Sequence, residues 1–395
     1  MRCHVRLLAG QVDRNAGSHA YHQELIRRLT ARGHRVSVVC FGATPDVCDC
    51  AEVYTIPRDD GVRRRVLWRL AYLFAYRHCM ARLRELDLDP PDVVLAGEHL
   101  LLKGHARRFP QTPWVYLPHS LVVSEEIRSY RLPAVMSFVA CRLYRHLQRW
   151  ALAHADRTMR FTRHACTVLA DAYGSQIRPR LWLNPMGVDL PAAAPRRAPA
   201  AEVRLLSVGR LIPSKNLTLA LGALSRLAHL PWRFDIVGDG WDREAAEHRA
   251  RQLGLAGRVH FHGHQRDPGP WYRRADLFLF PSQLENSPLV VLEAMSHAVP
   301  CLAVRADGAV YRHPLDELIA DGRTGMLARD EADCSRKLEA ALARPEVLPP
   351  LGEAARRYVA EHHTWERHLD RYEELFEELI GVRHSPAPKA LAAAP

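Results

Sequence analysis

Short apolar runs rich in β-branched residues alternate with helix-like segments along the first half of the chain. The runs at Cys3–Ala9 and Val36–Phe41 predict strands, and the apolar positions of Ser18–Arg32, between them, recur at helical spacing. Later strands are expected at Asp92–Ala96, Trp114–Pro118 and Thr158–Thr162. Strands that alternate with helices in this way predict a mainly parallel, doubly wound α/β sheet.

The alternation is interrupted once and then starts again. Residues 191–201 consist wholly of proline, alanine and arginine without periodicity, which is typical of an interdomain linker. Beyond the linker, strands are expected at Val203–Val208, Phe234–Val237, Val259–His262, Leu277–Phe280 and Cys301–Val304. A chain of 395 residues has room for two domains. We therefore expect two Rossmann-like domains, at 1–190 and 202–360.

The end of the chain has its own pattern. Glu361–Ile380 is rich in Glu, Arg and Leu and predicts a final helix. We expect the helical segment 361–382 to pack back toward the first domain. The remaining residues, 383–395, are rich in alanine and proline and are expected to be disordered.

The net charge of +11 is carried by the first half of the chain. Residues 1–190 hold 28 Lys and Arg against 17 Asp and Glu, whereas residues 191–395 hold 27 of each kind. This asymmetry predicts that the first half faces an anionic partner, which could be a membrane surface, an anionic substrate or nucleic acid. No nucleic-acid recognition motif accompanies the charge, so nucleic acid is not expected.

Ligands of open α/β sheets bind beyond the carboxyl ends of the strands, so the loops there are the candidate sites. The loop after Val203–Val208 begins at Gly209 and holds Arg210 and Lys215, five residues apart and just before a predicted helix. A guanidinium that binds oxygens in pairs and an ammonium point charge together suit a diphosphate without a metal ion. The alternative interpretation is a solvated loop that is basic by composition.

The loop after Leu277–Phe280 carries two carboxylates. Glu285 precedes Pro288, a suitable first residue for a helix, and Glu293 lies about one and a half turns into that helix. Backbone N–H groups at the helix start, near Ser287–Val290, can hold phosphate. The two carboxylates can bind hydroxyls at two ends of a nucleotide sugar. The alternative is an ordinary capped helix with a surface glutamate.

Five segments of the second half, taken in order, resemble glycosyltransferase family 4, whose members have the GT-B fold. This resemblance implies that the two domains face a central cleft. The five segments read VGRLIPSKN, IVGDGWDREA, RVHFHGH, ADLFLFPSQLENSPLVVLEAMSHAVPCLAV and ELIADGRTGML. Glu285 and Glu293 fall on the E-x7-E motif of that family. The resemblance is strongest over Glu202–Leu327, and the first half adds RGHRVSVV, LPHS, AD-x4-FT and NPMGVD.

The resemblance implies a role for each matched residue. Arg210 and Lys215 would hold the diphosphate and stabilise the leaving group. Glu285 would bind hydroxyls of the donor sugar, Glu293 would bind the ribose, and His119 would face the donor sugar. The other donor-binding positions that it implies are Gly17, before the first long helix, and Gly209, Gly238, Asn286, Ser287, Pro288 and Leu289.

The implied reaction is retaining transfer of a hexose-type sugar from a UDP- or GDP-linked donor to a hydroxyl of a glycan, a lipid-linked acceptor or a small molecule. Breaking the glycosyl–phosphate bond places negative charge on the diphosphate, which the cations would stabilise. No carboxylate is evident as a covalent nucleophile, so the acceptor is expected to attack from the side of the leaving group. No metal and no cofactor are expected. Asp87-Leu88-Asp89 spells D-x-D, but a turn before Pro90-Pro91 is the simpler interpretation.

Three departures from the family pattern leave the sugar and the acceptor open. The first loop reads Ala16-Gly17 where two glycines are common, and Glu285 is followed by Asn286-Ser287-Pro288 in place of Gly-Phe-Gly. The stretch Arg305–Leu315 is longer than usual and rich in charge and histidine. The alternative enzyme class is a nucleotide-sugar epimerase, which can have the same fold.

Two segments concentrate the basic charge. Gly61–Arg84 holds seven arginines and no acid, and as a helix it would place Arg65, Arg69, Arg77 and Arg84 within about a third of its circumference. Ile127–Arg163 holds eight arginines and one acid, Asp156. Basic helices with aromatic residues suit an anionic membrane surface, and a packed face with solvated arginines is the other interpretation. Nine scattered cysteines and the lack of an apolar leader predict a cytoplasmic protein, peripheral on the inner face of the membrane in the first of these cases.

Overall fold

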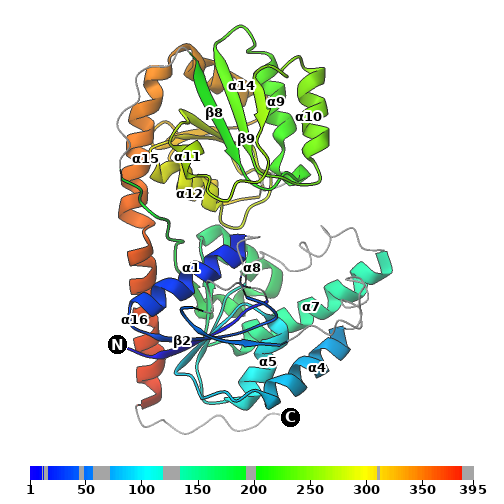
Figure 1. The fold of residues 1–395 in the computed structure, drawn as a ribbon, viewed down its shortest axis with the longest axis vertical. Helices are drawn as coiled ribbons and strands as arrows, with labels where there is room; N and C mark the ends of the chain where they lie inside the picture. The colour runs from blue at the N-terminus through cyan, green and yellow to red at the C-terminus, as the bar shows by residue number, and fades with distance from the viewer. Residues whose placement is uncertain are drawn as a thin grey trace. The chain divides into compact units, whose positions relative to one another are not determined.

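Residues 1–10, 12, 17–43, 49–56, 72–118, 134–192, 202–308 and 312–384 are described by a computed structural model. These residues form two units, each built on its own sheet (Figure 1). The first unit comprises Met1–Arg160, Ala165–Asn184 and the chain from Leu369 onward. The second unit comprises Phe161–His164 and Pro185–His368.

The first unit contains a seven-stranded parallel sheet in the order β3-β2-β1-β4-β5-β6-β7. Its strands are β1 (His4–Leu8), β2 (Arg35–Cys40), β3 (Glu52–Thr55), β4 (Val93–Ala96), β5 (Trp114–Tyr116), β6 (Arg157–Arg160) and β7 (Leu181–Leu183). The helical segments of this part of the chain are α1 (Gly17–Ala31), α4 (Tyr72–Glu85), α5 (His99–Arg108), α7 (Ala134–His154), α8 (Arg163–Tyr173) and η1 (Ser175–Arg180). Apolar residues of the strands and of α5, α7 and α8 form its core, as expected for a sheet buried on both faces.

The second unit contains a six-stranded parallel sheet in the order β10-β9-β8-β11-β12-β13. Its strands are β8 (Val203–Val208), β9 (Trp232–Val237), β10 (Val259–Phe261), β11 (Leu277–Phe280), β12 (Cys301–Val304) and β13 (Gly325–Ala328). Its helical segments are η2 (Pro213–Lys215), α9 (Leu217–Ser225), α10 (Arg243–Gln252), α11 (Gly269–Tyr272), α12 (Leu289–Ser296), α13 (Leu315–Leu318), α14 (Glu331–Ala343), η3 (Pro345–Val347) and α15 (Leu348–His362). The order of each sheet reverses once, between β1 and β4 and between β8 and β11, which is where doubly wound sheets bind ligands.

The predicted doubly wound α/β architecture is confirmed in both units, and every predicted strand is present within a few residues. The sequence analysis missed three short strands, β3, β7 and β13. It was wrong in joining Glu361–Ile380 into one helix. The structure ends α15 at His362 and begins α16 (Trp365–His384) after a break at His363 and Thr364. Because α16 continues to His384, residues 383 and 384 are helical and do not belong to the disordered tail expected from residue 383. The rest of that tail lies outside the described residues.

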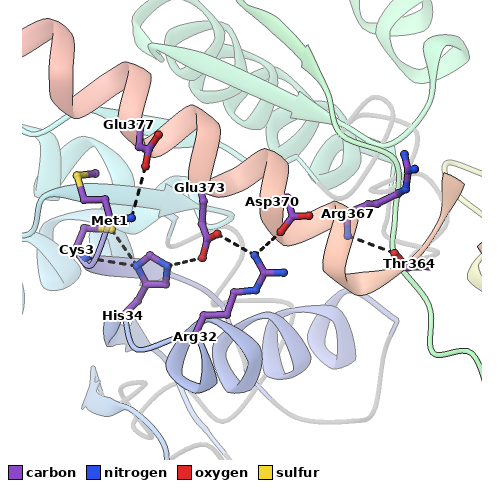
Figure 2. Close-up of polar contacts among 9 residues, drawn as sticks. All are labelled: Met1, Cys3, Arg32, His34, Thr364, Arg367, Asp370, Glu373 and Glu377. Carbon is purple, nitrogen blue, oxygen red and sulfur yellow. Dashed lines mark hydrogen bonds and ion pairs between the residues drawn. The ribbon is translucent and has the colours of Figure 1, made fainter. Parts of the chain in front are cut away.

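The part of α16 from Leu369 onward belongs to the first unit and is tied to it by polar contacts (Figure 2). Arg32 Nη1 lies 2.7 Å from an Asp370 carboxylate oxygen and 2.9 Å from a Glu373 oxygen. His34 joins Glu373, at 3.1 Å from Nε2, to the Cys3 thiol, at 3.2 Å from Nδ1. Residues from the two ends of the chain thus share one polar network.

Candidate functional site

The loops that follow β8 and β11 meet at the carboxyl ends of these two adjacent strands. The Gln283 N–H donates to the Ser214 carbonyl at 2.8 Å, and the Ser282 hydroxyl donates to the same carbonyl at 3.3 Å. The first loop begins at Gly209, whose φ of +152° favours glycine. These contacts fix the Arg210–Lys215 loop against the loop that carries Glu285.

Lys215 and Glu285 form an ion pair between Nζ and Oε1, although 70 residues separate them in the sequence. The Ser282 hydroxyl donates to the same carboxylate oxygen at 2.7 Å. The Lys215 and Glu285 side chains are 24% and 12% exposed, so both are reachable by a ligand but shielded from bulk water. The structure therefore brings together the two residues that the sequence analysis assigned to the diphosphate and to the donor sugar.

Arg210 lies on the same loop and is exposed. Within the part of the chain that the structure describes, no carboxylate pairs with its guanidinium. This leaves a cation at the carboxyl end of β8 that can bind a phosphate group.

Gly238 holds a second loop against the first. A Cβ atom at Gly238 would lie 1.9 Å from the Gly209 carbonyl oxygen, and the φ of Gly238 is +133°. The Leu211 N–H donates to the Asp239 carbonyl at 2.9 Å, and a Cβ at Gly240 would lie 2.1 Å from the Leu211 carbonyl oxygen. The two glycines thus permit a backbone approach that positions the Arg210 loop.

The start of α12 differs in detail from the prediction. Pro288 precedes the helix, with φ −78° and ψ 85°, and is not its first residue. The Leu289 N–H donates to the Ser287 carbonyl at 3.0 Å, so this amide is already used and is not directed at a ligand. Asn286 and Ser287 are half-buried beside it, and the Asn286 carbonyl accepts from the Thr162 hydroxyl at 3.5 Å.

Glu293 lies on α12 beside a buried tyrosine. The Tyr272 hydroxyl donates to Glu293 Oε2 at 2.9 Å, and the Tyr272 ring stacks on His297 with centroids 5.2 Å apart. Burial raises the pKa of Glu293 above its usual range, the hydrogen bond from Tyr272 opposes this, and the nearby Asp189 carboxylate adds to it. Glu293 is therefore held inward by a specific partner, which is not the arrangement of a solvated surface glutamate.

The unusual stretch after β12 returns to the same loop. The Glu285 N–H donates to the Arg312 carbonyl at 3.1 Å, and the Arg312 N–H donates to the Gln283 carbonyl at 2.7 Å. His313 follows and is buried. Burial lowers the pKa of His313, and the Glu285 and Asp316 carboxylates oppose that change. The backbone of Arg312 therefore fixes the loop that carries Glu285, and the buried His313 follows directly in the sequence.

Two predicted site residues belong to the first unit. His119 lies outside the described residues, as do Arg65 and Arg69 of the first basic segment. Gly17 is the first residue of α1, whereas the prediction placed it just before the helix. The glycine is thus at the expected end of the helix, one position further in.

Sequence reasoning missed Ser282, Tyr272 and His313. Ser282 stands three residues before Glu285, within a motif already recognised, and a hydroxyl at that spacing is a signal that could have been used. Tyr272 and His313 are far from Glu293 and Glu285 in the sequence, and no local pattern joins them.

Two family models match the chain at the places where these two units lie. One, described as Glycosyltransferase Family 4, matches residues 16–191, and one described as Glycosyl transferases group 1 matches residues 202–344. The chain belongs to glycosyltransferase family 4. A D-inositol 3-phosphate glycosyltransferase of Geodermatophilus obscurus is 30% identical to it, over 95% of this chain and 88% of the relative.

Solved glycosyltransferases share the fold of this family 4 member. WaaG, a glycosyltransferase involved in lipopolysaccharide biosynthesis, matches with a TM-score of 0.73 and 20% identity, covering 95% of this chain and all of its own. Anabaena HepE in complex with UDP-glucose matches with a TM-score of 0.70 and 16% identity, with the same coverage. These likenesses confirm the predicted GT-B fold class, with two Rossmann-like α/β units.

Proposed function

We propose that this family 4 glycosyltransferase transfers a hexose-type sugar, with retention, from a UDP- or GDP-linked donor to a hydroxyl of a glycan, a lipid-linked acceptor or a small molecule. The observation that carries the proposal is the Lys215–Glu285 ion pair between the loops after β8 and β11. It joins a cation suited to a diphosphate and a carboxylate suited to sugar hydroxyls at one point, with Arg210 on the same loop.

The contacts of the site support one role for the two cations and another for Glu285. A bound diphosphate would draw Lys215 and Arg210 to its oxygens, and Glu285, still held by Ser282, would accept hydrogen bonds from the sugar hydroxyls. The bond between the anomeric carbon and the phosphate oxygen breaks, and its electron pair goes to the diphosphate, where the two cations stabilise it. The acceptor oxygen bonds to the same carbon from the side of the leaving group, and its proton passes to the departing phosphate oxygen.

Glu293 would hold the ribose. Tyr272 occupies Oε2 of this carboxylate, which leaves Oε1 for a ribose hydroxyl. Gly209, Gly238, Asn286, Ser287, Pro288 and Leu289 would complete the donor-binding surface of the second unit. The resemblance also assigns donor binding to Gly17 and His119 of the first half of the chain. The HepE structure with UDP-glucose supports a nucleotide-sugar donor for this fold. No relative or structure named above favours the epimerase alternative.

The test uses donor turnover in the presence of a chelator. Arg210 and Lys215 provide cations for the leaving group, so we propose that no metal ion and no cofactor are needed. Purified protein treated with EDTA should bind and slowly hydrolyse one of UDP-glucose, UDP-galactose, UDP-N-acetylglucosamine or GDP-mannose. Loss of activity in EDTA that manganese restores would contradict metal independence, and isomerised donor without free nucleotide would point to an epimerase.

The excess charge of the first half supports a second proposal, which concerns location. We propose that the first unit contacts an anionic membrane surface through Gly61–Arg84 and the arginines of α7, so that the enzyme is cytoplasmic and peripheral on the inner face of the membrane. Of Gly61–Arg84, the structure describes 72–84, where Arg84 is exposed near the end of α4. In the described part of the chain, no helix is long and apolar enough to cross a membrane.

A further inference from the structure

A cavity of about 520 Å³ lies in the first unit, away from the residues assigned to the donor. It is lined by Arg149, Leu152, Ala153, Tyr173, Gln176, Ile177 and Arg180. These residues come from the last turns of α7, the end of α8 and η1. Because α7 leads into β6 and η1 leads into β7, the cavity lies at the amino ends of these strands. Substrates of doubly wound sheets bind at the opposite edge, so this cavity is a separate feature.

The rim of the cavity is basic. Arg180 Nη1 donates to the Ala155 carbonyl at 3.1 Å and also to the Ala153 carbonyl, which anchors the guanidinium at the carboxyl end of α7. Arg149 is exposed on the other side. Burial raises the pKa of Tyr173 to about 12, and the positive charges of Arg145 and Arg149 oppose that rise. The charges of Arg145 and Arg149 therefore act on Tyr173, which is a residue of the cavity wall.

The positive charge continues along α7. Arg142, Arg145 and Arg149 are all exposed, and their spacing of three and four residues places them on one face of the helix. Asp171, on the neighbouring helix α8, is acidic. Its Oδ1 lies 3.8 Å from Nη2 of Arg178 in η1. A row of arginines longer than the cavity fits a surface with many phosphates better than a single soluble anion.

The walls indicate what the cavity can hold. Leu152, Ile177 and the Tyr173 ring give it an apolar side, and Arg149, Arg180 and Gln176 give it donors. A glycerophosphate group, with its phosphate at the arginines and its carbon chain against the apolar side, has this combination. None of the residues that line the cavity is among the exposed large hydrophobic residues of the described chain, which are Met1, Leu190, Trp241 and Val347.

We infer that the cavity between α7 and η1 binds the glycerophosphate headgroup of an anionic phospholipid, and that the arginine row of α7 lies along the membrane surface beside it. This inference rests on the proposed membrane contact and is independent of the transferase reaction. It assigns the contact to a defined subsite of described residues, beyond the charge of the segment as a whole.

The test is co-sedimentation of the full-length protein with sucrose-loaded vesicles of phosphatidylcholine, with and without phosphatidylglycerol. Binding should require phosphatidylglycerol and weaken with added salt, because salt screens the attraction. Each arginine near an anionic surface contributes about fivefold in partitioning. The triple substitution Arg142→Gln, Arg145→Gln and Arg149→Gln should therefore weaken binding about 100-fold. A charge-matched control changes Arg249, Arg251 and Arg344 of the second unit, which are also exposed, to Gln; it should bind like the wild type.

A second variant tests the cavity without changing charge. Ala153 is exposed at its rim, so Ala153→Trp should fill the cavity and weaken binding to phosphatidylglycerol vesicles while the arginines remain. Vesicle binding by Ala153→Trp equal to that of the wild type would overturn the headgroup subsite. Binding of soluble glycerol 1-phosphate that Arg149→Gln removes, with no vesicle binding, would show a soluble ligand and overturn the lipid assignment.

Donor hydrolysis by the same variants separates this inference from the proposed reaction. None of the substituted residues belongs to the donor site, so hydrolysis should stay at the wild-type rate. Absence of donor hydrolysis by the wild type, with binding to phosphatidylglycerol vesicles retained, would count against the transferase proposal alone.

Discussion

The two units share one architecture but place their ionisable side chains differently. In the second unit, charged partners gather at the carboxyl ends of strands, where Lys215 pairs with Glu285 and Tyr272 holds Glu293. In the first unit, the strands themselves bury arginines. Arg6 donates to the Ser37 hydroxyl at 3.0 Å and Arg160 to the Pro118 carbonyl at 2.6 Å, and burial lowers the pKa of both to about 10.

This difference shows that the architecture of the sheet does not determine where ionisable side chains gather. Both sheets are parallel and doubly wound, yet only the loops of the second unit bring a described cation and carboxylate together at a ligand-binding edge. In the first unit, the arginines considered for membrane contact lie instead on α4, on α7 and at η1, and not at that edge. Function is a property of sites placed on a fold, and we propose sites of different kinds for the two units.

The largest effect is expected when the Lys215 cation of the second unit is removed. Lys215→Ala should lower turnover about 100- to 1000-fold, because one contact that stabilises the leaving group is lost. Lys337→Ala is the matched control, since Lys337 is similarly exposed and pairs with Asp321 at 2.8 Å outside the site. The measurement is the initial rate of nucleotide release, with circular dichroism to confirm folding. Near wild-type turnover by a folded Lys215→Ala protein would remove the basis for the assignment.

A backbone substitution tests whether the loops must approach each other. Gly238→Ala should destabilise the second unit by about 3 kcal/mol or weaken donor binding strongly, because the new Cβ would collide with the Gly209 carbonyl and φ is positive. Gly257→Ala is the control, since a Cβ there meets nothing within 4 Å; its effect should stay within about 0.5 kcal/mol. Urea unfolding and donor KM are the measurements. Equal behaviour of the two variants would show that the loop contact is unimportant.

Much of this arrangement could be predicted from the sequence. The pairing of Lys215 with Glu285 was accessible because each residue stands in a motif that follows a strongly apolar strand, and adjacent strands bring such loops together. The strands β3 and β7 were missed because they are only four and three residues long and their residues are mostly half-exposed. The break before α16 has no proline or glycine to mark it.

The parts of the site that escaped prediction depend on tertiary contacts. Tyr272 reaches Glu293 across 21 residues, and Arg312 pairs its backbone with the Glu285 loop. Neither contact leaves a periodic trace in the sequence. The Leu289 N–H donates within its own turn because of the backbone dihedral angles of Pro288. Residue type alone does not determine these angles.

Substitution of Glu293, the half-buried carboxylate on α12, should have a smaller effect on stability. The direction in which this effect changes with pH can be predicted. Because the folded-state pKa of Glu293 is raised, its contribution to stability falls as pH rises from about 4.5 through the folded-state value. Glu293→Gln should therefore become progressively more stable relative to the wild type as the pH rises above about 4.5, while nucleotide affinity drops about tenfold through loss of a ribose contact. Urea unfolding across this range and calorimetric titration measure the two quantities. The exposed Glu339→Gln variant should show neither change, and a stability difference that narrows with rising pH would contradict the account.

The smallest predicted effect concerns the tie between α16 and the first unit. Glu373 accepts from Arg32 and contacts His34 (Figure 2), so Glu373→Gln should lower the free energy of unfolding by about 1 kcal/mol. Its exposed neighbour Glu374 provides the control, because Glu374→Gln should leave stability unchanged. Chemical denaturation followed by tryptophan fluorescence compares them, and indistinguishable unfolding curves would show that this network adds nothing.

We propose that the loops after β8 and β11 bind a nucleoside diphosphate without a metal ion. The most direct measurement is calorimetric titration of UDP and of GDP into the EDTA-treated wild type, Lys215→Ala and Lys337→Ala proteins. We expect the wild type and Lys337→Ala to bind one of the two nucleotides with equal affinity. Lys215→Ala should bind that nucleotide at least about tenfold more weakly, because a charged contact is lost. Absence of binding by either nucleotide, or equal affinity in Lys215→Ala, would contradict this proposal.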